Sequence, residues 1–359
     1  MVPTKPTFIS NTALAPSTAP IPASGATSLS LSENFPVGNQ IMKRLNLRYS
    51  GALSLTESAA GTVIAGGGLQ NIRGLTLQTP QHGVIFNNID GQGLSDLQFL
   101  TRQVRPFASD ISSAATGTPS FSYRIPLDFR DPSALFPDAT GLDMIQVQAV
   151  QLTITIGGAT DFISGGTYSV EEITPLNLEL DADTDPAPDP ASIPSLMRYV
   201  NLLRTPINQT QAQFQIKLPY GNRLIKRYLV EQVNSSTFAR LANTIVGVND
   251  QDRISFAVGG VDWFHRIEWL ALQERMQDDY GISAPLTGAA VVGWDHRDAV
   301  GHNPAQYMGL NNPEAGSPIV EIDVDVTSVT NGSIWTYEDG VMPIPVSAQR
   351  PAPAVAKVP

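Results

Sequence analysis

The strongest constraint on the fold of this chain is an internal repeat. Asp128-Phe-Arg-Asp131 recurs as Asp295-His-Arg-Asp298, an offset of 295 − 128 = 167 residues. The same offset aligns the alternating apolar residues before each copy and a stretch of helical periodicity further upstream, 94–104 on 261–271. Three features in one register predict a duplicated unit of about 150 residues, which is the size of one domain.

The periodicity of apolar residues indicates strands in both halves. Segments 121–129, 213–218 and 320–326 alternate as strands with one buried face do. In 145–156 the apolar positions change parity between Ala149 and Val150, which predicts a β-bulge. Asn331-Gly332, after 320–326, is a hairpin signal.

Helical periodicity is confined to two places, 92–104 and Trp263–Met276. In the second, Phe264, Ile267 and Ala271 share one stripe. Two helices cannot supply the crossovers of a parallel sheet. We therefore expect an all-β chain of two tandem jelly rolls (β-sandwich or barrel domains), each with one inserted helix.

Composition sets the boundaries of these units. Residues 1–38 are rich in Ala, Pro, Ser and Thr and predict a flexible N-terminal arm, and 343–359 predict a Pro/Ala-rich C-terminal arm. Residues 181–195 predict an acidic, Pro-rich linker, because prolines and repelling carboxylates keep a chain extended. The first jelly roll is then expected at 39–180 and the second at 196–342.

Charge and cysteine content narrow the function classes. The net charge of −11 argues against wrapping of nucleic acid, and we expect no sequence-specific nucleic-acid partner. The chain has no cysteine, so disulfides, Cys-based metal sites and cysteine nucleophiles are excluded. No signal peptide and no apolar run of transmembrane length is evident.

The search for chemistry predicts no catalytic, cofactor-binding or metal site, and no enzyme activity. His296 and His302 lie near the second Asp-x-Arg-Asp motif, but their spacing matches no zinc signature. The repeated motif is better explained as a turn in which a carboxylate caps backbone N–H groups and pairs with a guanidinium. The acidic run from Asp181 begins like an EF-hand loop but has Pro186 where the loop needs Gly, so only weak Ca²⁺ binding stays open. Ala65-Gly-Gly-Gly68 lacks the Lys of a phosphate loop and is expected to be a flexible connection.

One stretch resembles a known family. Residues 44–55, a Gly-rich loop, 69–77 and the continuation through Ile89-Asp-Gly91 into the first helix resemble the opening of double jelly-roll major capsid proteins. These belong to tailless icosahedral phages, many with an internal membrane, in the lineage of corticoviruses, tectiviruses and the adenovirus hexon. The residues that carry this resemblance lie at about 40–105.

The resemblance implies a structural role in a virion. Three chains would form a homotrimer with a pseudo-hexagonal outline, and these capsomers would tile an icosahedral shell. Partners would be neighbouring capsomers, penton or vertex and minor capsid proteins, and an internal lipid membrane where one is present. The protein would be assembled in the host cytoplasm and reside in the capsid. Two alternatives remain, namely another virion component such as a spike or vertex protein, and a carbohydrate-binding tandem β-sandwich.

Overall fold

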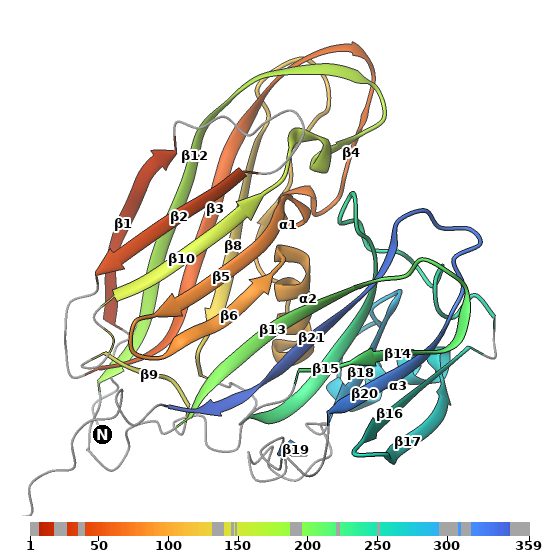
Figure 1. Ribbon diagram of the computed structural model, residues 1–359. Coiled ribbons are helices and arrows are strands. Elements are labelled where there is room, and N and C mark those ends of the chain that lie inside the picture. Colours follow the sequence, from red (N-terminus) through yellow and green to blue (C-terminus); the bar gives the residue numbers. More distant parts are fainter. Residues whose placement is uncertain are drawn as a thin grey trace, which may run out of the picture.

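The computed structural model describes residues 7–17, 27–34, 40–130, 140–144, 147, 149–186, 196–219, 223–249, 252–293, 308–309 and 317–344. Eight strands of the first half form two facing sheets (Figure 1). They are β1 (Thr7–Ser17), β2 (Thr27–Asn34), β3 (Gln40–Ala59), β5 (Ile72–Thr79), β6 (Gly83–Ile89), β8 (Ser120–Asp128), β10 (Ala149–Ile156) and β12 (Thr167–Pro186). Lettered B to I in chain order, they lie as B-I-D-G (β1-β12-β3-β8) and C-H-E-F (β2-β10-β5-β6), which is the strand order of a jelly roll.

The second half repeats this order. Its strands are β13 (Leu196–Pro206), β14 (Gln211–Lys217), β15 (Leu224–Asn234), β16 (Arg253–Val258), β17 (Val261–Glu268), β18 (Ala289–Gly293), β20 (Pro318–Val324) and β21 (Gly332–Pro343). The same lettering gives B-I-D-G (β13-β21-β15-β18) and C-H-E-F (β14-β20-β16-β17). The prediction of two tandem jelly rolls is therefore confirmed.

Shorter elements complete the described part of the chain. Five short strands are β4 (Thr62–Val63), β7 (Ala108–Ser109), β9 (Leu142–Asp143), β11 (Ile163–Ser164) and β19 (Met308–Gly309). The helices are α1 (Gly67–Asn71), α2 (Gly91–Arg102), α3 (Trp269–Tyr280) and a 3-10 turn, η2 (Ala159–Asp161). α2 and α3 both lie between the fifth and sixth strands of their rolls, so they are topologically equivalent, as the repeat predicts.

Local sequence explains the elements that were predicted well. In β8 the side chains of Phe121, Tyr123, Ile125 and Leu127 are buried and alternate with less buried ones, as the two-residue period requires. Asp90 caps the N-terminus of α2, and its carboxylate accepts a hydrogen bond from the Gly93 N–H at 3.2 Å.

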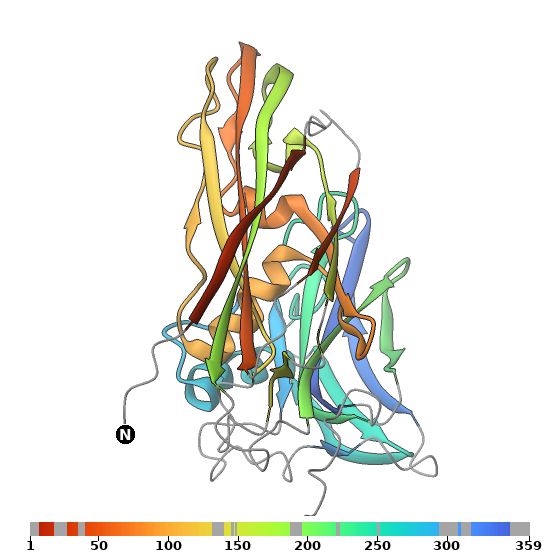
Figure 2. The same ribbon diagram turned by 90° about the vertical axis from the view of Figure 1, so that its left-hand side faces the viewer.

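The N-terminal segment differs from the prediction of a flexible arm over 1–38. β1 pairs along β12, and β2 pairs along β10, so two stretches of this segment supply the first two strands of the first roll. Figure 2 shows β1 and β2 on the first roll, and Figure 1 places them on the side away from the second roll. A polar, Ser/Thr-rich strand is stabilised by backbone pairing to a sheet edge, which its composition does not reveal.

The acidic linker also begins later than predicted. Residues 181–186 belong to β12 and pair with β3, where Asp181 lies opposite Asn46 and Pro186 opposite Gln40. An extended segment that lies beside an unpaired sheet edge can hydrogen-bond to it and lengthen the strand. The predicted extended backbone of 181–186 therefore did not distinguish a linker from a strand. Residues 187–195 and 345–359 lie outside the described residues.

The second predicted helix starts too early. Residues 261–268 are strand β17, with Phe264 opposite Phe256 and Ile267 opposite Ile254, and α3 begins only at Trp269. A short apolar pattern spaced by three fits either element, and pairing with β16 decides for the strand. The starts of α2 and α3 therefore differ by 269 − 91 = 178 residues, not 167.

The predictions of a hairpin, a β-bulge and a flexible loop are also wrong. Asn331 has the positive φ of a tight turn, 60°, but β20 and β21 lie in different sheets, so no hairpin forms. No register shift falls between Ala149 and Val150, because the parity change there marks the start of β10. The Gly-rich segment is no flexible connection: Gly67 and Gly68 open α1, and an added Cβ at Gly68 would lie 1.9 Å from the Tyr123 ring.

Candidate functional site: the seam between the jelly rolls

The two rolls share one continuous sheet. β6 of the first roll pairs in parallel with β13 of the second, with Phe86 opposite Val200 and Asn87 opposite Asn201. Asn87 donates a hydrogen bond to the Asn201 side chain at 2.8 Å. The sheet therefore runs from β2 through β6 and β13 to β18 as nine strands, counting β19.

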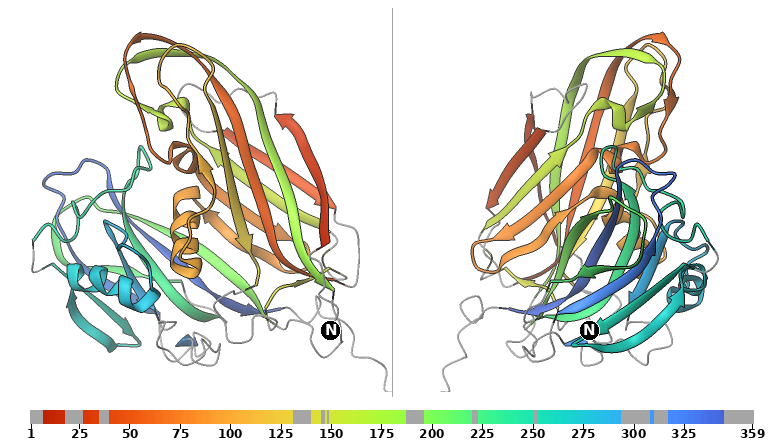
Figure 3. Two further views of the ribbon diagram at one scale, coloured as in Figure 1. Left: turned by 180° about the vertical axis from the view of Figure 1, so that it is seen from behind. Right: turned by 45° about the vertical axis from the view of Figure 1, so that its right-hand side comes forward.

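The second roll has one sheet that is buried on both faces. Along β15, Tyr228 and Val230 belong to the core of the second roll, whereas Leu229 and Val233 belong to the core cluster of the first. Trp335 on β21 also joins the first cluster. This outer face is the seam, where β13, β15 and β21 meet α2 and its flanking residues 90–105 (Figure 3). The hydrophobic effect therefore opposes separation of the rolls, because separation would expose this shared core.

Close packing positions α2 on the seam. An added Cβ at Gly93 would lie 2.2 Å from Cε1 of Tyr337 on β21, so only glycine lets the helix approach this ring. The Tyr337 hydroxyl donates to the Asp90 carboxylate at the helix N-terminus. Arg240 of the second roll pairs with the same carboxylate at 2.8 Å. The start of α2 is thus held from the second roll by two side chains.

The first repeated aspartate lies at the seam. The Asp128 carboxylate is 2% exposed and accepts from Arg44 Nε at 2.6 Å and Arg102 Nη2 at 2.7 Å. Arg198 of β13 lies 4.0 Å from its other oxygen. The predicted pairing with guanidinium groups is found, but the arginines come from β3, α2 and β13, and Asp128 lies in strand β8 rather than in the predicted turn. The second copy, 295–298, lies outside the described residues together with His296 and His302.

Arg198 extends this network into the second roll. It forms a two-pronged pair with Asp339 of β21, at 2.8 and 3.0 Å. Arg227 of β15 lies 3.4 Å from Asp339 and donates to Thr101 of α2 at 3.0 Å. Burial alone would raise the pKa of Asp339, but Arg198, Lys226 and Arg227 together hold it below its ordinary value. The carboxylate is therefore ionised at neutral pH, and its pairs are charge-assisted.

A loop of the second roll forms another contact with the first. Phe238 takes a left-handed backbone conformation, φ 62°, and its ring packs edge-on against Trp335 with centroids 5.1 Å apart. Arg73 of the first roll lies 4.8 Å from the centre of the Phe238 ring. Gln70 donates to the Thr237 carbonyl at 2.7 Å. A bulky residue with positive φ is strained, so the surrounding contacts must compensate for this conformation.

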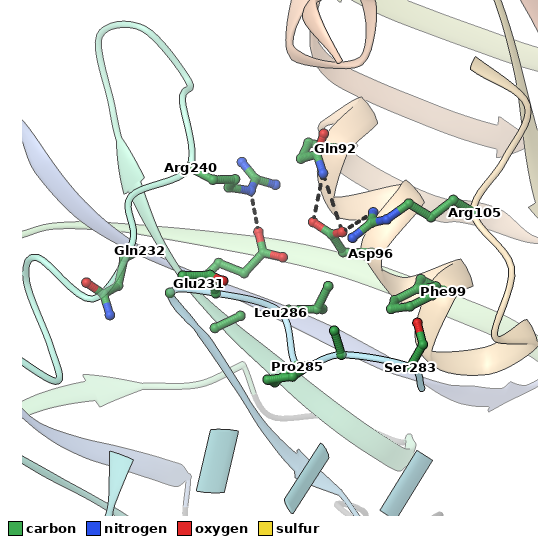
Figure 4. A pocket seen from close by; sticks show the side chains of 14 residues that line it. Gln92, Asp96, Phe99, Arg105, Glu231, Gln232, Arg240, Ser283, Pro285 and Leu286 are labelled. Atoms are coloured by element: carbon green, nitrogen blue, oxygen red, sulfur yellow. Dashed lines mark hydrogen bonds and ion pairs between the residues drawn. The ribbon is translucent and has the colours of Figure 1, made fainter. Parts of the chain in front are cut away.

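One pocket opens at the seam, with a volume of about 510 Å³ (Figure 4). Gln92, Asp96, Phe99 and Arg105 line it from the first roll, and Glu231, Gln232, Arg240 and residues 283–289 line it from the second. Arg105 pairs with Asp96 at 2.6 Å, and Arg240 Nε lies 2.7 Å from Glu231 Oε2. Both guanidinium groups are thus already engaged with carboxylates.

The described residues contain no group of three or more His, Asp or Glu side chains arranged to hold a metal ion. His82 is buried in the turn after β5, and His265 is exposed and 2.8 Å from Asp262. The backbone from Asp181 to Asp185 is strand rather than a loop that could wrap Ca²⁺. Within the described part of the chain, no helix is long and apolar enough to cross a membrane.

Two jelly rolls of one strand order, joined side by side in a single chain, define the double jelly-roll fold. No family model and no curated protein matches the sequence. Solved structures share the fold. The MCP of STIV (Sulfolobus Turreted Icosahedral Virus) is 15% identical, with a TM-score of 0.64 over 97% of this chain and 100% of that one.

Two further structures extend the likeness. The PBCV-1 virus capsid protein is 13% identical, with a TM-score of 0.62 over 98% of each chain. The major capsid protein P2 of bacteriophage PM2 is 14% identical, with a TM-score of 0.56 over 94% of this chain and 98% of that one. At such low identities the likeness establishes the fold, and it confirms the fold that the sequence resemblance implied.

Proposed function

We propose that this chain is a major capsid protein that forms pseudo-hexagonal homotrimeric capsomers and tiles an icosahedral virion shell. The observation that carries the proposal is the pair of rolls with identical strand order, held together through one sheet and buried ion pairs. Capsid proteins of STIV, PBCV-1 and PM2 share this whole-chain architecture.

The geometry supports an assembly role. Two like rolls per chain give six like lobes in a trimer, which is the outline that fills a hexagonal lattice. The seam fixes the angle between the rolls, so each chain presents a rigid pair of flanks to its neighbours. Lateral contacts between trimers and contacts with vertex or minor capsid proteins would use the remaining surface, and an internal membrane, where the virion has one, would lie beneath.

The proposal places the protein in the virion, with assembly in the host cytoplasm and no catalytic role. It also revises the domain boundaries, because β1 and β12 extend the first roll to 7–186. In this proposal the second roll spans 196–343, from β13 to β21.

Light scattering of the purified full chain tests the trimer. One chain is 38.5 kDa, so the proposal predicts a particle of 3 × 38.5 = 115.5 kDa. A stable monomer at low micromolar concentration would contradict it. Gln213→Ala on the exposed edge strand β14 is a control for nonspecific effects of substitution on the measured mass.

A further inference from the structure

The pocket at the seam contains two buried carboxyl groups that face each other from different rolls. Asp96 of α2 is 4% exposed and Glu231 of β15 is 2% exposed. Figure 4 shows both side chains pointing into the space between α2 and β15. Two ionised carboxylates that are both buried away from water would repel each other strongly, so a compensating charge is needed between them.

The neighbouring cations do not supply enough charge for both. Arg105 serves Asp96, but its side chain is 45% exposed and therefore screened by solvent. Arg240 is divided between Glu231 and Asp90, the carboxylate at the start of α2. Within the described part of the chain, Asp96 and Glu231 are therefore compensated by one solvent-screened guanidinium group and by part of a second.

Among the described residues, the other elements packed around Glu231 place no second cation against it. The segment 282–289, which covers the pocket, has no titratable side chain. β21 contributes the neutral phenol of Tyr337, which donates to Asp90. Arg204 donates to the backbone carbonyls of Arg73 and Asn88, and its charge acts on Asp90 rather than on Glu231.

We propose that Glu231 carries a proton, donates it in a hydrogen bond to Asp96, and so forms a proton-dependent contact between the two rolls. With the proton in place, the Glu231 O–H donates to the Asp96 carboxylate and α2 stays against β15. At high pH hydroxide takes up this proton, and the water that forms leaves to solvent. Two ionised carboxylates then face each other, and α2 loosens from the second roll. The inference does not depend on a capsid role.

The electrostatics of the site agree with this geometry. Burial raises the pKa of Glu231 well above its ordinary value, Arg240 opposes this, and Asp96 and Asp90 raise it further, with Asp96 accepting the hydrogen bond. The sign follows from linkage: the unfolded or opened state releases the proton from about pH 4.5 upward, and the closed state keeps it to higher pH. The contribution of the pair to seam stability is thus present at low pH and is lost as pH rises through the raised pKa.

Hydrogen exchange of the full chain between pH 5 and 9 tests the proposal. After correction for intrinsic exchange rates, the opening constant of α2 amides is expected to rise by up to tenfold per pH unit in the wild type, because opening releases one proton. Glu231→Gln keeps a donor toward Asp96 at every pH and should remove this slope. Glu321→Gln, which alters a carboxylate of β20 bonded to Gln215, is the matched control and should keep it.

Asp96→Asn is a second variant in case Glu231→Gln does not fold, since its amide donates to Glu231 from the other side. Circular dichroism and gel filtration establish which variants are folded. A wild type without a slope, or a slope that persists in every folded variant of the pair, would overturn the proposal. Restoration of protection at high pH by CaCl₂ in the wild type alone would assign a cation instead of the proton and would also overturn it.

Discussion

Replacing Asp128 with Ala removes the carboxylate that three arginines approach at the seam. Breaking a buried ion pair from one side costs about 3–5 kcal/mol, because the partner is left buried and unpaired. Here the penalty is smaller. Arg44 and Arg102 are 22% and 32% exposed and regain water, and Arg198 keeps its pair with Asp339. We therefore expect a loss of about 2–3 kcal/mol in the free energy of unfolding.

Urea denaturation of the full chain, followed by tryptophan fluorescence, measures this loss. The matched control is Asp262→Ala, whose carboxylate is 49% exposed and pairs only with His265 among the interactions described; it should change stability by no more than about 0.5 kcal/mol. A loss below about 1 kcal/mol for Asp128→Ala would mean that this aspartate behaves as a surface carboxylate. The assignment of the repeated motif to the seam would then be refuted.

Three further perturbations address other parts of the structure. Gly93→Ala should lower stability by about 1–3 kcal/mol, because its Cβ would meet the Tyr337 ring; a thermal midpoint at or above that of the wild type would contradict this contact. Deletion of residues 1–38 removes β1 and β2 and exposes the edges of β12 and β10, so it should yield aggregated or markedly less stable protein. A monodisperse variant with an unchanged thermal unfolding midpoint would argue against the two strands. Burial lowers the pKa of His82 from 6.5 to about 4, and Asp143 opposes this shift. The free energy of unfolding should therefore fall by up to about 3 kcal/mol as the pH drops from 6.5 toward 4. His82→Asn, which can retain the contact to Thr79, should remove that part of the pH dependence.

The sequence predicts strands well where one face is buried and the other is exposed. β8 and β20 have that environment, and their alternation was visible. The repeat also places β8 and β18 correctly, because 122–126 plus 167 gives 289–293, the bounds of β18. The offset fails for the helices, because the connections between the fifth and sixth strands differ in length in the two rolls.

Elements decided by distant pairing could not be recognised. β1 and β2 consist largely of small and polar residues, and only Leu29 and Leu31 hint at alternation in the second. β17 was mistaken for helix because an eight-residue strand followed directly by a helix gives one continuous apolar pattern. In each case the deciding contact comes from a strand elsewhere in the chain.

The contacts at the seam could not be predicted from the sequence for a related reason. Arg198 and Arg227 lie in strands where a charged residue normally faces water, and nothing nearby in the sequence shows that a second roll covers them. One signal was available: Lys226 and Arg227 interrupt the apolar run of β15, and charged residues within a run of this kind are buried in pairs. Their partner Asp339 is more than a hundred residues away, so the pair follows only from the fold.

Electron microscopy of the purified full-length protein tests the central claim most directly. The account predicts three-fold symmetric particles with six lobes and a pseudo-hexagonal outline, each pair of lobes being one chain with its rolls in the arrangement of Figure 1. Particles containing a single pair of lobes, or rings of another symmetry, would contradict a capsomer built from three chains.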